Sequence, residues 1–199
     1  GQVTIFVIIA ILVVAVVVLF YFLSPKLGID LSAEEKNPQK FIETCIKDEL
    51  TENIETISLQ GGSLEPAAFF TYNNIPIEYL CYTNEYYVTC VVQQPQLKSH
   101  IEEEIKNSIQ DTTDSCFNSL KQSYEQKGYQ VSMKAGIINI ELLPQKIITH
   151  LNYEITLTKS SSEKYENFDI ILNNNLYELI SIANSITEWE ANYGEADVT

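Results

Sequence analysis

Residues 38–62, "PQKFIETCIKDELTENIETISLQGG", predict the helix around which the folded part of the chain is built. Pro38 suits a first helical turn, and the two glycines at 61–62 supply a stop. Between them, apolar residues recur at spacings of three and four, as on one face of a helix: Ile42, Ile46, Leu50, Ile54 and Ile57. Cys45 lies beside this stripe, so we expect its sulfur to face a neighbouring element rather than open water.

Residues 97–128 predict a second, longer amphipathic helix, with a break near residues 111–114 and an end at Gly128. Cys116 falls within the apolar face of this helix. Two helices packed on a common sheet would bring Cys116 close to Cys45. A bridge between them would close a loop of about 70 residues and stabilise the fold by roughly 4 kcal/mol.

Strand-like patterns follow at residues 129–143, 146–158 and 165–173. The first contains Ala135–Gly136 and is compatible with a hairpin of its own. Helical spacing returns at 176–186. The expected fold class is therefore α+β: a long N-terminal hydrophobic helix followed by a globular head with amphipathic helices packed on an antiparallel sheet.

Residues 76–95 predict a β-hairpin, because strand-forming residues flank the turn-like "TNE" at 83–85. Cys81 and Cys90 would face each other across its arms. Its tyrosines are candidates for a surface contact, and ordinary strand pairing with one face in the core is the alternative. The tyrosines concerned are Tyr82, Tyr86 and Tyr87.

The four cysteines predict two disulfides outside the cytoplasm, with buried free thiols as the alternative. Three pairings are available to four cysteines, and we favour Cys81–Cys90 together with Cys45–Cys116. No cysteine pair has the spacing of a zinc site, and only His100 and His150 are available as imidazole ligands. We therefore expect no metal site.

Residues 1–25 carry no charge, and the uncharged run from Val3 to Leu23 is 21 residues long. As a helix it would be about 32 Å long, close to the thickness of a bilayer's hydrocarbon core. In lipid only a helix satisfies its own backbone hydrogen bonds, so we expect a helix here. Residues 26–37 are a polar linker, and residues 38–199 are expected to form an extracytoplasmic α+β head.

The composition excludes nucleic-acid binding as the main function. The net charge is −15, and all 12 basic residues are lysines, whereas nucleic-acid binders rely on Lys and Arg for phosphates and on Arg for bases. No catalytic motif is present, so we expect neither an enzyme nor a cofactor. His100 and Glu104 stand four residues apart and are close enough to share a site, but we assign these glutamates to a solvated helix face. His150 is expected to point outward from a strand.

An uncharged N-terminal helix without a preceding start codon, followed by a disulfide-bearing α+β head, resembles the layout of type IV pilins and related archaeal surface filaments. In that family a prepilin peptidase removes a short basic leader, and the hydrophobic helix waits in the membrane before it becomes the filament core. Many bacterial members carry Glu at the fifth mature position, and archaeal members often lack it. This chain has Ile5 there when counted from Gly1, or Phe6 when cleavage leaves Gln2 first. The resemblance implies such a peptidase and a pilus assembly machinery as partners.

The first functional hypothesis is a structural subunit of an extracellular filament, with the acidic head exposed for surface contact or adhesion. The chain would be inserted in the membrane before assembly and form a homopolymer afterwards. The residues expected to pack between copies are Val3, Ile5, Phe6, Ile9, Ala10, Val13, Ala15, Val17 and Phe20. The alternative is a single-span, membrane-anchored cell-surface binding protein that does not polymerise.

Overall fold

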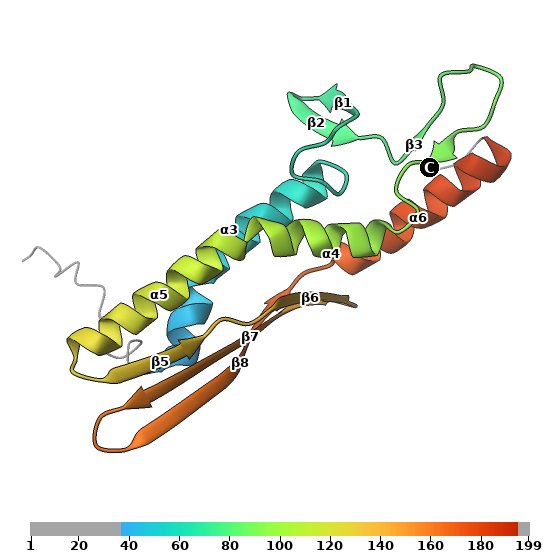
Figure 1. Cartoon of the computed structure of the whole chain (residues 1–199). Helices are drawn as coiled ribbons and strands as arrows, with labels where there is room; N and C mark the ends of the chain where they lie inside the picture. The colour runs from blue at the N-terminus through green and yellow to red at the C-terminus, as the bar shows by residue number, and fades with distance from the viewer. Residues whose placement is uncertain (1–36, 195–199) are drawn as a thin grey trace, which may run out of the picture. The chain divides into compact units, whose positions relative to one another are not determined.

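The structure, a computed structural model, describes residues 37–194 (Figure 1). From Pro38 onward these residues belong to a compact unit that runs to Thr199. Its helices are α3 (Pro38–Leu59), α4 (Leu97–Ser108), α5 (Gln110–Gln126) and α6 (Leu176–Tyr193). Its short strands are β1 (Phe69–Tyr72), β2 (Ile75–Glu78), β3 (Cys81–Tyr82) and β4 (Val91–Val92). The strands of its main sheet are β5 (Gln130–Lys134), β6 (Ile138–Leu143), β7 (Lys146–Thr158) and β8 (Ser162–Asn173).

The main sheet is built around β7, which pairs antiparallel with all three of its neighbours. β8 runs along one side of β7, while β5 and β6 follow each other along the other side. The register of the β7–β8 pair shifts between Leu151 and Glu154 of β7. At the same point, the strand on the other side of β7 changes from β6 to β5. At this junction Gly136 passes so close to β7 that a Cβ atom there would lie 1.7 Å from the backbone oxygen of Asn152. Glycine is required because no side chain fits.

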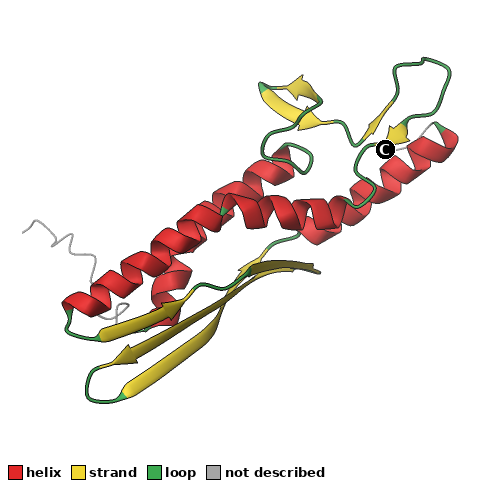
Figure 2. Cartoon of the chain, viewed as in Figure 1, coloured by secondary structure: helices red, strands yellow, loops and turns green. Residues whose placement is uncertain are grey.

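Helices cover one face of this sheet, as Figure 2 shows, and the core lies between the two layers. The stripe of α3 predicted from the sequence is fully buried: Ile42, Ile46, Leu50, Ile54 and Ile57. α4 contributes Leu97, Ile101 and Ile105 to the same core. Along β7, buried and less buried residues alternate, because successive side chains point to opposite faces of a sheet. The opposite face of the sheet therefore carries its polar residues.

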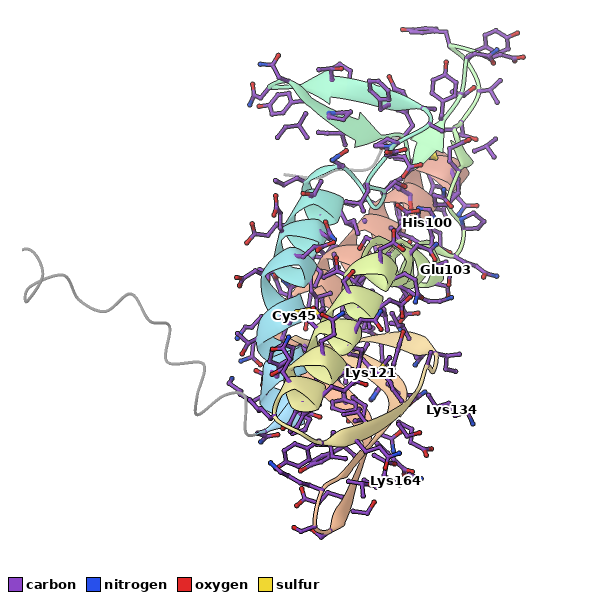
Figure 3. The ribbon with its side chains drawn as sticks, turned by 60° about the vertical axis from the view of Figure 1, so that its left-hand side comes forward. Cys45, His100, Glu103, Lys121, Lys134 and Lys164 are labelled. Atoms are coloured by element: carbon purple, nitrogen blue, oxygen red, sulfur yellow. A yellow bond between two sulfur atoms is a disulfide. The ribbon has the colours of Figure 1, made fainter. Side chains whose placement is uncertain are left out.

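Both disulfides form with the favoured pairing. Cys45–Cys116 joins α3 to α5 with the Cα atoms 6.0 Å apart, and Figure 3 shows these two helices side by side with Cys45 labelled. Cys81–Cys90 joins the base of the β3–β4 loop with the Cα atoms 5.4 Å apart. The prediction that two helices on a common sheet would be bridged is confirmed.

An aromatic cluster fills the core between α5 and the sheet. Phe117 stacks on Tyr153 with ring centroids 4.1 Å apart and meets Phe168 edge-on at 5.0 Å. The Tyr153 hydroxyl donates a hydrogen bond to Oδ1 of Asp114 at 2.5 Å. Burial, and then this contact with Asp114, raises the pKa of Tyr153 to about 12.

The predicted fold class is wrong in its first part. Within residues 37–194 no helix is long and apolar enough to cross a membrane, because each of the four is amphipathic and has polar residues on its outward face. Residues 1–25, where the long hydrophobic helix was expected, lie outside the described residues. The remainder is an α+β fold with helices packed on an antiparallel sheet.

Two predicted hairpins are also corrected. Residues 76–95 do not form one hairpin: β2 pairs with the preceding strand β1, and β3 pairs with β4 over only two residue pairs. β5 and β6 pair with β7 rather than with each other, because the chain at Gly136 continues along β7 instead of turning back. The predicted break in the long helix falls at Ile109, slightly earlier than expected.

We predict that the double substitution Cys45→Ala/Cys116→Ala destabilises the head by about 4 kcal/mol, because the bridge restricts the unfolded chain over a long loop. The matched control is Cys81→Ala/Cys90→Ala, whose bridge spans 9 residues instead of 71 and should cost about 3 kcal/mol or less. Denaturant unfolding of oxidised protein measures both. A larger loss for the control pair would contradict the prediction.

The raised pKa of Tyr153 predicts a loss of stability at high pH. The hydroxyl titrates near 10 in an unfolded chain and near 12 in the fold, so its contribution is fully present below pH 10 and disappears as the pH rises through 12. The free-energy gap between the native chain and Tyr153→Phe should therefore be constant below pH 10 and shrink towards pH 12. The matched control is Tyr86→Phe, which removes the same hydroxyl at a fully exposed position. Urea titrations between pH 8 and 12 provide the measurement.

Candidate interaction surface

Most of the exposed large apolar side chains are grouped in two parts of the described chain, while Leu59, Ile137 and Ile171 are exposed singly elsewhere. One part is the segment between the end of α3 and the start of α4, and the other is α6. The exposed residues of the first part are Phe69, Phe70, Tyr72, Tyr82, Tyr86, Tyr87, Val88 and Val91. We call this group the aromatic loops. Grouped apolar exposure of this kind marks interaction sites more often than scattered single residues do.

The β1–β2 hairpin presents three of these aromatic residues. Asn73 and Asn74 have φ values of 50° and 66°, the left-handed pair that a tight two-residue hairpin turn requires. The strands are short, and all four residues of β1 are exposed. Phe69, Phe70 and Tyr72 therefore project from a hairpin that buries none of them fully.

The β3–β4 loop presents the tyrosines that the sequence indicated. Tyr86 and Tyr87 are 105 % and 86 % exposed, and Tyr82 is about half exposed. The loop has only two strand pairs, so the Cys81–Cys90 bridge closes it. Its base rests on α6, where Cys81 lies 3.9 Å from the backbone oxygen of Thr187. The expectation that strand pairing would bury one face of these tyrosines does not hold for Tyr86 and Tyr87, while their role in surface contact stays a prediction.

A polar cluster anchors the β1–β2 hairpin to the helices. The Ser63 hydroxyl lies between Oε2 of Glu78 on β2, at 2.5 Å, and Nε2 of His100 on α4, at 2.8 Å. One turn further along α4, Glu104 accepts the backbone N–H of Leu64 at 3.0 Å. His100 and Glu104 thus share one site, as their spacing allowed, and Figure 3 labels His100 on α4. The assignment of Glu104 to a solvated face was wrong.

The order of groups in this cluster differs from that of a catalytic triad. In a triad the imidazole stands between the nucleophile and the acid, so that it can take the hydroxyl proton and be oriented in turn. Here the hydroxyl of Ser63 stands between the imidazole and the carboxylate of Glu78. Ser63 is also only 5 % exposed. The arrangement satisfies buried polar groups and fixes the hairpin.

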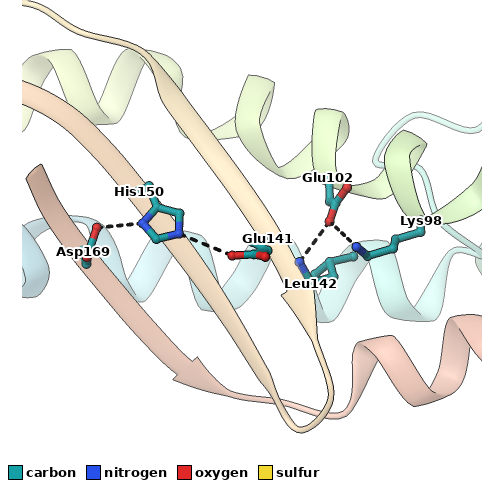
Figure 4. Close-up of polar contacts among 6 residues, drawn as sticks. All are labelled: Lys98, Glu102, Glu141, Leu142, His150 and Asp169. Atoms are coloured by element: carbon teal, nitrogen blue, oxygen red, sulfur yellow. Dashed lines mark hydrogen bonds and ion pairs between the residues drawn. The ribbon is translucent and has the colours of Figure 1, made fainter.

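A second polar row crosses the uncovered face of the main sheet (Figure 4). His150 on β7 points outward, as predicted, with Nδ1 2.9 Å from Asp169 on β8 and Nε2 3.6 Å from Glu141 on β6. Beside it, Glu102 of α4 accepts the backbone N–H of Leu142 at 3.0 Å and pairs with Lys98. The His150 row links three strands, and Glu102 joins α4 to β6. Both imidazole nitrogens of His150 face carboxylates, so the row is a set of polar contacts between side chains on neighbouring strands.

Residues 37–194 contain no group of three or more side chains arranged to hold a metal ion. Four cysteines that were named as site residues are all in disulfides. The nine residues expected to pack between copies, from Val3 to Phe20, lie outside the described residues. The sequence reasoning missed Phe69 and Phe70, for which the signal was "FFTYNN", a strand-like run before an Asn–Asn turn.

Searches of protein-family models, of curated proteins and of solved structures found no match to this chain.

We predict that Glu104→Gln loosens the β1–β2 hairpin, because it weakens the charge-assisted bond to the Leu64 N–H at a cost of about 1–3 kcal/mol. Hydrogen exchange should then speed up at Leu64 and at Glu78, whose N–H bonds to the backbone of Gln60. The matched control is Glu103→Gln on the same helix, where the carboxylate is exposed and pairs with Lys106 on the helix surface. Equal exchange in both variants would show that Glu104 does not anchor the hairpin.

Proposed function

We propose that this chain is a structural subunit of an extracellular pilus-like filament, assembled through its uncharged N-terminal segment and displaying the acidic head outward. The observation that carries the proposal is the unequal distribution of charge along the sequence. Val3–Leu23 has no charge at all, and the remainder carries the entire net charge of −15. A segment of this composition is stable only where water is excluded, in lipid or among other copies.

The two disulfides of the head support a location outside the cytoplasm. Disulfides persist in oxidising compartments and are rare in reducing ones. Both cysteine pairs are bridged, and the described residues include no free cysteine. One bridge ties the helical layer together, while the other closes a surface loop. A head that is cross-linked in both its helical layer and its surface loop suits exposure at a cell surface.

The acidic head is suited to the outside of an assembly. Like charges on neighbouring heads repel each other, so copies stay soluble unless another force joins them. In the proposed filament that force comes from burial of the uncharged segments, and the heads form the outer layer. The aromatic loops then face the surroundings, where Tyr rings combine a large contact area with a polar tip.

A second candidate is a membrane-anchored surface protein that binds a partner without polymerising. The extreme exposure of Tyr86 and Tyr87 favours it, since aromatic residues held on a cross-linked loop are typical contact residues. Both candidates place the head outside the cell and differ in what surrounds the uncharged segment.

We predict that Val13→Lys prevents filament formation in the full chain, because a charge at the middle of the uncharged segment has no partner among neighbouring copies. The matched control is Val88→Lys, which places the same residue on the exposed β3–β4 loop and should leave filaments intact. Electron microscopy of material sheared from producing cells gives the answer. If the unaltered chain is recovered only as monomers in the membrane fraction, the filament proposal is wrong and the anchored candidate stands.

A further inference from the structure

Helix α6 carries two apolar faces, of which the fold uses only one. Leu176 and Ile180 are buried in the core, and Ala183 packs against it. A second line of large apolar residues runs along the helix from one end to the other and remains exposed by 36–68 %. We call this line the α6 seam: Leu179, Ile182, Ile186, Trp189 and Tyr193.

The spacing of the seam residues matches that of two helices packed side by side, so we expect the partner surface to be a helix. Its members follow each other at intervals of 3, 4, 3 and 4 residues. This is the alternation by which paired helices keep one line of side chains in mutual contact. At the far end, the rings of Trp189 and Tyr193 lie 4.5 Å apart and contact each other.

We propose that a second copy of this chain covers the seam with its own α6, forming an antiparallel pair of helices between two heads. Of the four described helices, only α6 has a run of exposed apolar residues at this spacing; α3 exposes Leu59 alone among its large apolar residues. A two-fold pair needs a patch that is complementary to itself, which one uniform seam provides.

The seam itself is uncharged, which suits an apolar partner surface such as a second seam. The charged residues of α6 lie outside it and are all acidic: Glu178, Glu188 and Glu190. Glu178, at its start, accepts the backbone N–H of Gln145 at 2.9 Å and is therefore engaged within the head. In an antiparallel pair Glu178 lies opposite the end that carries Asn192, away from Glu178 of the other copy.

The size of the seam makes the pair weak. Covering these five side chains removes roughly 500 Å² from each copy, or about 1,000 Å² in total, the lower limit for a specific interface. Such a pair forms where copies are already concentrated, for example on one surface or in one assembly. The pairing belongs to the head and does not rest on filament assembly through residues 3–23.

The experiment uses the full chain in its native surroundings, with a photo-crosslinking phenylalanine derivative in place of Ile182. We expect cross-linked dimers in which the attached peptide comes from residues 176–193 of a second copy. The matched control carries the same derivative at Asn184, on the exposed polar side of α6, and should give no dimer. Cross-linking to another protein, to residues 1–36 of a copy, or to nothing would overturn the proposal.

A second variant tests the seam itself. In the chain with the photo-crosslinker at 182, Ile186→Asp should lower the dimer yield about tenfold, because each copy then buries an unpaired charge. Asn184→Asp adds the same charge outside the seam and should leave the yield unchanged. Circular dichroism and intact disulfides confirm the fold of both variants. Equal yields in the two variants would overturn the proposal.

Salt distinguishes this pair from a contact with a basic protein. Two copies of an acidic head repel each other, so screening should raise the dimer yield as salt increases, whereas binding to a basic partner weakens. A yield that falls with salt would contradict pairing between copies. The dimers should also form in the Val13→Lys chain when it is purified and concentrated, and their absence there would overturn the assignment of pairing to the head, separately from the filament proposal.

Discussion

The constraint on which the rest of this fold depends is that the main sheet buries only one of its faces. β7 provides the axis, and every strand of the sheet is held by hydrogen bonds to it. Its inward residues need a cover, which α3, α4 and α5 supply together. The Cys45–Cys116 bridge ties two of these helices to each other, so the cover behaves as one layer. The outward face is left to polar residues such as His150 and Asp169.

Because the core lies between the helices and the sheet, the segment between α3 and α4 has little core to join. Its two small sheets are held by other means: the polar cluster around Ser63 fixes one, and Cys81–Cys90 closes the other. Local anchors of this kind allow aromatic residues to stay exposed without unfolding the segment. The exposure of Tyr86 and Phe70 is thus a consequence of where the core ends.

The sequence predicted most of the core and little of the periphery. The stripe of α3 and the strand at 146–158 were visible because burial on one side forces a period of 3.6 or 2 residues. The disulfide pairing followed from the same faces. The single hairpin expected at 76–95 failed because which strand pairs with which depends on tertiary anchors, here Glu78 with Ser63, that no local pattern contains. Glu104 was misassigned for the same reason: its partner, the Leu64 N–H, is 40 residues away.

α6 shows the limit of periodicity most clearly. Leu176 and Ile180 follow helical spacing, and so do Leu179, Ile182 and Ile186, so the sequence predicts one helix with a broad apolar surface. Only the structure separates the part that the core uses from the part that it leaves exposed. An apolar line kept in water lowers solubility, and in this chain it is carried by a head whose net negative charge opposes association. These opposing terms make the proposed contact between heads weak and sensitive to salt.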